Sequence, residues 1–241
     1  MLEFTRPHHK LIQKALRNFN SEYLDEHRIL FGGGTRIALE LDEYRESIDI
    51  DFLCPDKESY RAVRAVVTPN SLGNIVKSEF EYLREIRLDR DGTRCFIQME
   101  GVPIKLEFVS FANYEIKKDE INQFEVPSID HQSCYLTKIL ANADRYNDRP
   151  YKDIFDLLTM FENWGEISDE TWHAADNHYS FKEVFRGLEI ACSKIQNDPQ
   201  KYLTIACDEL KIESMRANQI VFEVNTKFAA YIRQKKEFYI K

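Results

Sequence analysis

The sequence predicts an α+β fold, with a sheet and its flanking helices first and a purely helical region after it. Residues 48–52 and 104–109 alternate apolar and charged side chains with a period of two, which is typical of half-buried strands. Residues 83–88 and 93–99 flank an Asp-Arg-Asp-Gly turn, and Asp-Gly between two apolar runs is a strong hairpin signal. These segments predict the strands of one sheet.

The alternation stops at about Pro127, and apolar residues recur at helical spacing from there onward. We therefore expect two domains, residues 1–125 with the sheet and residues 126–241 with helices only. A chain of 241 residues can bury an adequate core in either arrangement.

The elements of the first domain follow from local signals. Apolar spacing predicts an amphipathic helix over about residues 7–25 and a short strand at 29–31. Asp56, which follows a proline, is expected to cap a helix through residues 59–67.

The strand at 48–52 carries the most informative pattern of the chain. Ile48, Ile50 and Phe52 should be buried together, which leaves Asp49 and Asp51 on the opposite face. Two like charges so placed repel each other unless a cation holds them. Mg²⁺ suits such a pair, because it is usually bound by one or two carboxylates and by substrate phosphates.

A later strand, 104–109, repeats this arrangement. Ile104, Leu106 and Phe108 point to one side, so Glu107 points to the other and can face the same cleft as the two aspartates. We expect Glu107 to be a candidate third carboxylate.

Just before the aspartates, a glycine-rich turn enters a helix. Gly33 and Gly34 allow backbone N–H groups to approach a phosphate, and Thr35 is expected to cap the helix. A phosphate cradle and a metal-binding carboxylate pair within about twenty residues indicate phosphoryl or nucleotidyl transfer.

The helical half has its own signals. Asp130 is a candidate cap for the first helix, and Ser180 with Glu183 reads as a capping box. The apolar stripes predict helices around 136–143, 154–161, 201–210 and 214–233, with a break at 147–150.

Bulk properties exclude several classes of protein. A formal charge of −8 argues against nonspecific coating of nucleic acid, which requires positive charge. The five cysteines lie far apart, so neither a disulfide framework nor a zinc site is indicated. No apolar run approaches the ~20 residues of a membrane span and no signal peptide is evident, so we expect a cytoplasmic protein with no membrane partner.

The glycine turn followed by Asp-x-Asp resembles the nucleotidyltransferase motif of the DNA polymerase β superfamily. More narrowly, Gly33-Gly34-Thr35 followed by Arg45-Glu-Ser47-Ile-Asp49-Ile-Asp51-Phe is similar to the AbiEii/AbiGii toxin family. The resemblance implies a nucleotidyltransferase-fold mixed sheet followed by an α-helical domain. It also implies that Asp49, Asp51 and Glu107 hold Mg²⁺, and that Gly33, Gly34, Thr35, Arg45 and Ser47 contact the nucleotide.

The resemblance extends into the helical half. Lys138 and the Lys-Asp-x-x-Asp-Leu segment containing Asp153 match positions that are characteristic of the family. It implies that Lys138 and Asp153 are catalytic and that Lys138 also offsets nucleotide charge.

The resulting hypothesis is a Mg²⁺-dependent transfer of a nucleoside monophosphate from an NTP to a hydroxyl of a macromolecular acceptor. By resemblance, the acceptor is a tRNA end or a protein side chain, and the chain is the toxin of a toxin–antitoxin pair with a cognate antitoxin. Asp51 or Glu107 would accept the hydroxyl proton. Two alternatives stay open, an adenylyltransferase acting on an antibiotic-type small molecule and a non-catalytic interaction module that retains the fold.

Overall fold

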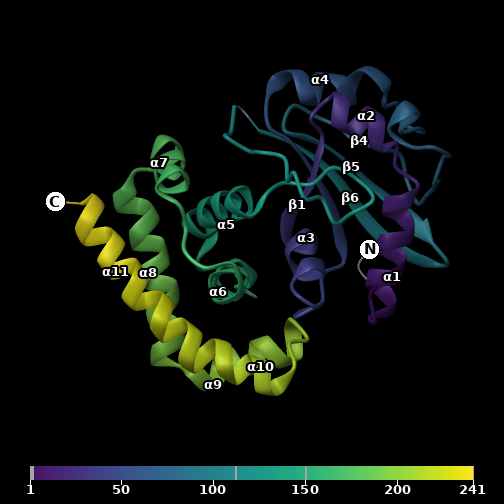
Figure 1. Ribbon diagram of the computed structural model, residues 1–241. Helices are drawn as coiled ribbons and strands as arrows, with labels where there is room; N and C mark the ends of the chain where they lie inside the picture. Colours follow the sequence, from purple (N-terminus) through teal and green to yellow (C-terminus); the bar gives the residue numbers. More distant parts are fainter. Residues whose placement is uncertain (1–2, 112, 150, 241) are drawn as a thin grey trace. The chain divides into compact units, whose positions relative to one another are not determined.

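The structure is a computed structural model that describes residues 3–111, 113–149 and 151–240, and Figure 1 shows its elements. It divides into two compact units, one of Met1–Glu43 and Ser47–Asp130 and the other of Tyr44–Glu46 and His131–Lys241. The chain therefore leaves the first unit after Glu43 and returns to it at Ser47. Within the described residues, no helix has the length and apolar character needed to cross a membrane.

The first unit contains a mixed sheet, which confirms the predicted fold class. Its strands lie in the order β1-β2-β6-β5-β3, with β4 also paired to β5. The β2–β6 pair is parallel and the remaining pairs are antiparallel. The described strands are β1 (Leu30–Gly32), β2 (Asp49–Cys54), β3 (Glu81–Tyr82), β4 (Arg87–Leu88), β5 (Gly92–Met99) and β6 (Val102–Ser110).

The predicted hairpin is present, but its first strand is shorter than predicted. Arg87–Leu88 pairs with β5 across the Asp-Gly turn, whereas residues 83–86 leave the strand. The backbone N–H of Ile86 donates to the carbonyl oxygen of Pro69 at 2.7 Å instead of to β5.

Four α-helices of the described residues flank the sheet in this unit, α1 (Pro7–Arg17), α2 (Ser21–Glu26), α3 (Gly33–Glu40) and α4 (Lys57–Val66), and a short 3₁₀ helix lies at Gly73–Ile75. The single helix predicted over 7–25 is wrong, because the chain breaks between α1 and α2. Phe19 is fully buried against Phe52 at that break, and Asn20 caps α2 by accepting from the backbone of Tyr23. Asp56 caps α4 as predicted, accepting from the backbone N–H of Ser59 at 2.9 Å.

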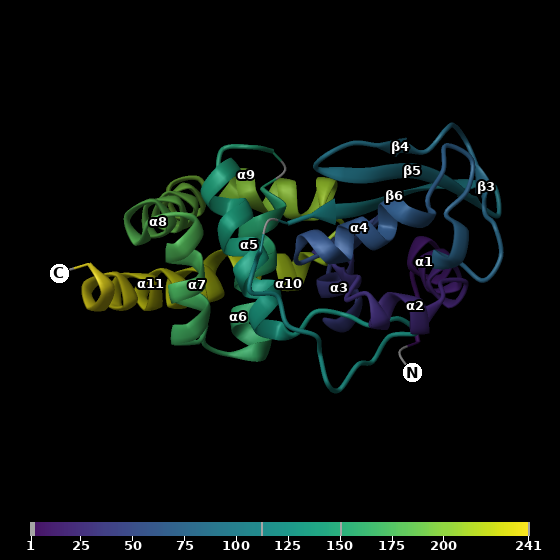
Figure 2. The same ribbon diagram turned by 90° about the horizontal axis from the view of Figure 1, so that it is seen from above.

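One face of the sheet forms the core of the unit, and helices α1, α2 and α4 pack against that core (Figure 2). Ile50, Phe52, Leu106 and Phe108 are fully buried on that face, as predicted for β2 and β6. Ile48 was expected to join them, but it is 52% exposed because β2 begins only at Asp49. The opposite face carries the charged residues of β2 and β6.

In the second unit, every described element is a helix, as predicted. Ser180 accepts a hydrogen bond from the backbone N–H of Glu183 and so caps its helix. Helices α8 and α11 lie side by side in both views (Figures 1 and 2). The helices are α5 (His131–Arg145), α6 (Lys152–Trp164), α7 (Asp169–His178), α8 (Phe181–Asn197), α9 (Pro199–Thr204), α10 (Ser214–Asn218) and α11 (Asn225–Tyr239), with π-helical turns at Ile205–Glu209 and Gln219–Val224.

The predicted break at 147–150 is consistent with the gap between α5 and α6, although residue 150 lies outside the described residues. Helix α7 was not predicted. Its Trp172 is fully buried and stacks on Phe185 of α8, so it supplies part of the core of this unit. The five cysteines carry free thiols.

Candidate functional site

The glycine turn joins β1 to α3 and lies directly against an aspartate. Gly33 has φ +70°, and a Cβ atom there would lie 2.2 Å from Oδ2 of Asp51. No L-side chain could occupy that space or adopt that backbone conformation without strain. The turn and the second aspartate of the strand are therefore adjacent, as the sequence suggested.

Thr35 does not cap α3, contrary to the prediction, because the helix already begins at Gly33. Its hydroxyl instead lies 2.8 Å from Oγ of Ser47 and within hydrogen-bond distance of the carbonyl oxygen of Asp49. A carbonyl only accepts, so the single Thr35 proton goes to Asp49 and the Ser47 hydroxyl donates to Thr35. These two predicted nucleotide contacts thus tie α3 to the start of β2.

Asp49 and Asp51 lie on one face of the sheet, with Lys105 and Glu107 beside them. The parallel register pairs Asp49 with Lys105 and Asp51 with Glu107. Both aspartates are partly exposed, and no described residue pairs with the side chain of Asp49. Two partly exposed carboxylates at i and i+2 fit the oxygen donors that Mg²⁺ prefers.

Glu107 shares that face but is already neutralised. Arg94 Nε donates to its carboxylate at 2.7 Å, and the Lys105 ammonium donates to the other oxygen. Partial burial raises the pKa of Glu107, but these two hydrogen-bonded cations lower it below its usual value. The described part of the chain holds no group of three or more His, Cys, Asp or Glu side chains that could bind a metal. A role for Glu107 as third ligand stays a prediction, and it requires Glu107 to release a cation.

The second unit contains a buried ion-pair network centred on Lys138 of α5. Its ammonium lies 2.8 Å from Oδ1 of Asp153 and 2.6 Å from Oδ2 of Asp156, both on α6. Lys138 is 5% exposed, Asp153 6% and Asp156 fully buried. Burial lowers the pKa of Lys138, yet the two carboxylates raise it above its usual value, so the lysine is charged.

Arg45 completes the network from a distant point in the sequence. Its Nε and Nη2 contact the two oxygens of Asp156 at 2.7 and 3.1 Å, a bidentate pair, and the Tyr44 hydroxyl donates to the same carboxylate. Arg45 is only 3% exposed. The sequence predicted Arg45 as a nucleotide contact, whereas in this conformation its guanidinium is committed to Asp156.

On the more exposed side, Arg145 of α5 contacts both oxygens of Asp153, at 2.6 and 3.0 Å. Burial raises the pKa of Asp153, but Lys138 and Arg145 together hold it well below its usual value. Three cations thus face two carboxylates. Lys152 lies close by, with its pKa lowered by burial and by the charges of Lys138 and Arg45.

Sequence reasoning missed two parts of this arrangement. Asp156 was not chosen, although its i+3 spacing from Asp153 on a helix was a usable signal. Arg45 and Asp156 are 111 positions apart, and no local pattern could have paired them.

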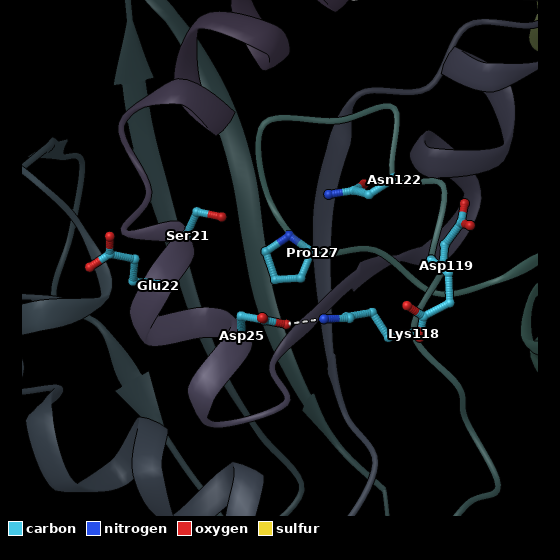
Figure 3. Close-up of a pocket in the computed structure, with 8 residues that line it drawn as sticks. Ser21, Glu22, Asp25, Lys118, Asp119, Asn122 and Pro127 are labelled. Carbon is cyan, nitrogen blue, oxygen red and sulfur yellow. Dashed lines mark hydrogen bonds and ion pairs between the residues drawn. The ribbon is translucent and has the colours of Figure 1, made fainter.

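A separate cavity of about 260 Å³ lies in the first unit, between α2 and the segment that follows β6 (Figure 3). Its wall includes the ion pair of Asp25 with Lys118, at 2.7 Å. None of the predicted site residues lines this cavity.

The chain matches the family model described as nucleotidyl transferase AbiEii toxin of a type IV toxin–antitoxin system, over residues 14–234. No curated protein matches it.

Three solved structures are similar in fold. A candidate nucleotidyltransferase from H. pylori has a TM-score of 0.55 at 15% identity, covering 94% of this chain and 95% of that one. JHP933 from Helicobacter pylori has a TM-score of 0.53 at 13% identity, covering 98% and 97%. An antigenic nucleotidyltransferase-like protein from Paracoccidioides brasiliensis has a TM-score of 0.50 at 17% identity, covering 83% and 94%.

Proposed function

Because this chain belongs to the AbiEii nucleotidyltransferase toxin family, whose model matches residues 14–234, we propose how its transferase activity is used. The chain transfers a nucleoside monophosphate from an NTP to a hydroxyl of a tRNA or a protein, with Mg²⁺ as cofactor. It acts as the toxin of a toxin–antitoxin pair and is held inactive by a cognate antitoxin.

The observation that carries this proposal is the placement of Asp49 and Asp51 on one face of β2, with Asp51 against the Gly33 turn. Asp49 and Asp51 would hold the Mg²⁺. When bound there, the ion would offset negative charge on the triphosphate and on the attacking and leaving oxygens.

The chain's own residues have distinct parts in this proposal. Gly33 leaves space at the turn where a phosphate can approach backbone N–H groups. Thr35 and Ser47 hold α3 and the start of β2 together through their hydroxyls. The expected offsetting of nucleotide charge by Lys138 and the catalytic part of Asp153 stay predictions, because Lys138 is paired with Asp153 and Asp156 in this conformation. Asp153 fixes the side chains of Lys138 and Arg145, which it contacts directly.

Asp51 and Glu107 are the two candidates for the proton acceptor, and the cations beside Glu107 count against it. Hydrogen bonds from Lys105 and Arg94 lower the pKa of Glu107, and a carboxylate whose pKa is lowered is a weaker base.

The test is incubation of the purified protein with each α-³²P-labelled NTP, Mg²⁺, and total tRNA or cell lysate. We expect label to enter RNA or protein with one nucleotide, and to be lost with EDTA or in the Asp49→Asn/Asp51→Asn variant. Asp91→Asn is the matched control, because Asp91 is an exposed carboxylate in the β4–β5 turn. Absence of label with every nucleotide and acceptor pool, together with no binding of Mg²⁺–NTP, would overturn the proposal.

A further inference from the structure

The two histidines at the start of α1 contact the backbone immediately before the aspartate strand. Nε2 of His9 lies 3.1 Å from the backbone N of Ser47, and Nε2 of His8 lies 3.0 Å from the carbonyl oxygen of Ile48. His9 is fully buried. The pair thus binds two consecutive residues, and Asp49 is the next residue along the chain.

The protonation of each ring follows from its partner. The backbone N–H of Ser47 only donates, so Nε2 of His9 is unprotonated and its proton is on Nδ1, which donates to Glu43 at 2.8 Å. The carbonyl of Ile48 only accepts, so Nε2 of His8 carries a proton. Burial lowers the pKa of His9, as do Arg6 and His8, and Glu43 does not reverse this lowering.

Glu43 is itself firmly held. Its carboxylate accepts from the backbone N–H and the hydroxyl of Thr5, both at 2.6 Å, and from the backbone N–H of Arg6 at 3.0 Å. Its backbone has φ +52°, a conformation that few non-glycine residues adopt without surrounding support. Four donors therefore converge on one buried carboxylate, counting that of His9.

Glu43 and Ser47, the two partners of His9, lie on either side of residues 44–46, which belong to the second unit. Glu43 is the last residue before the chain leaves the first unit, and Ser47 is the first residue after it returns. His9 bonds to both of them, so its ring bridges the two ends of the excursion. Displacement of Ser47 would also move its hydroxyl contact with Thr35, which in turn binds the carbonyl of Asp49.

We infer that His8, His9 and Glu43 form a positioning bracket. The bracket joins the residues on either side of 44–46 and fixes the start of β2, and with it Asp49, relative to the glycine turn. This inference rests on the proposed function for its catalytic consequence. The two histidines lie outside residues 14–234, so the family match assigns them no role. They are positioning residues, since they contact backbone atoms beside the aspartates.

Two amide variants of His9 separate its two hydrogen bonds. The longer side chain in His9→Gln places its amide where Nε2 lies and can still accept from Ser47, whereas the shorter side chain in His9→Asn reaches only the place of Nδ1 and keeps Glu43. We expect His9→Asn to speed hydrogen exchange at the Ser47 amide and to lower kcat, each by roughly tenfold or more, with little change in KM. His9→Gln should keep hydrogen exchange at the Ser47 amide within about threefold of the wild type, and its loss in kcat, from the missing Glu43 bond, should be smaller than that of His9→Asn.

His8→Leu adds a variant at a half-buried position, where folding is not at risk, and it should lower kcat by a few-fold. His173→Asn, at an exposed histidine of α7, is the control that should change nothing. The ¹⁵N shifts of the His9 ring in the wild type should report a neutral ring protonated on Nδ1.

The exchange and ring measurements need no substrate, so they test the bracket even if no nucleotide is transferred. Equal Ser47 exchange in His9→Gln and His9→Asn, or a His9 ring protonated on Nε2, would overturn the bracket. Failure of the wild type to transfer any nucleotide would overturn the proposed function instead.

Discussion

Two pairs of aspartates in this protein lie in different electrostatic settings. Asp153 and Asp156 are buried in the second unit, and each contacts two cations. Asp49 and Asp51 lie partly exposed on the sheet of the first unit, and no described residue pairs with the Asp49 side chain. A carboxylate whose charge is satisfied internally supports the structure, whereas one left beside a like charge is available to an external cation.

Removal of Asp156 should have the largest effect on stability. Asp156→Ala should lower the free energy of unfolding by about 3–5 kcal/mol, because Arg45 would remain buried without a counter-charge and Lys138 would keep only one of its two carboxylates, Asp153. Urea unfolding would measure the change, with Asp208→Asn at an exposed position as control. A loss below about 1 kcal/mol, typical of surface pairs, would mean that the network is not structural.

A substitution of Asp49 should leave stability intact and strongly reduce activity. Asp49→Asn should lower the rate of nucleotide transfer by roughly 10²–10³-fold, similar to the loss of other charge-stabilising groups. Its unfolding free energy should be unchanged or slightly higher, since a like-charge repulsion with Asp51 is removed. A stability loss comparable to that of Asp156→Ala would erase the distinction between the two pairs.

The contribution of Asp153 to the free energy of unfolding should depend on pH. The pKa of Asp153 in the folded state lies below its unfolded value of about 3.9, so the folded protein binds fewer protons. The ion pair's contribution is therefore complete above about pH 4 and declines as the pH falls through the folded pKa. The difference in unfolding free energy between wild type and Asp153→Asn should narrow on acidification.

Tryptophan fluorescence is a suitable probe for that experiment, because both tryptophans, Trp164 and Trp172, belong to the second unit. A difference between the two proteins that stays constant from neutral pH to pH 2 would argue against a charged Asp153 in the folded state.

The smallest expected effect is that of a substitution beside Glu107. Glu107 is neutralised by two cations, as Asp153 and Asp156 are, but it lies beside Asp51 on the sheet. Arg94 is 48% exposed, so Arg94→Gln should cost under about 1 kcal/mol of stability. It should tighten Mg²⁺ binding by a few-fold if Glu107 then turns to the ion. Calorimetric titration with Mg²⁺ would measure this, with Arg61→Gln as a control on an exposed pair; unchanged affinity would remove Glu107 from the ligand set.

Local patterns predicted the sheet well. Alternation in β2 and β6 identified the buried residues Ile50, Phe52 and Leu106 and placed Asp51 and Glu107 on a shared face, because side-chain direction in a strand follows from sequence alone. Element ends were less predictable. Ile48 lies before β2 rather than in it, and the N-terminal helix breaks where Phe19 is buried.

Apart from Glu107, the site was predictable only where its residues were close in sequence. The glycine turn and the two aspartates are separated by fewer than twenty positions. The role of Arg45 beside Asp156 and that of His9 beside Glu43 and Ser47 depend on tertiary contacts, for which the sequence carries no period or spacing. Thr35 was assigned as a cap because capping is its commonest local use, but its hydroxyl is committed to Asp49 instead.

We propose that Asp49 and Asp51, and not the buried pair, bind a divalent cation. Titration with Mn²⁺ followed by electron paramagnetic resonance, with and without a non-hydrolysable NTP, tests this most directly. We predict binding in the wild type and in Asp153→Asn, and at least a tenfold loss of affinity in Asp49→Asn. Equal affinity in wild type and Asp49→Asn, or a loss confined to Asp153→Asn, would contradict the account.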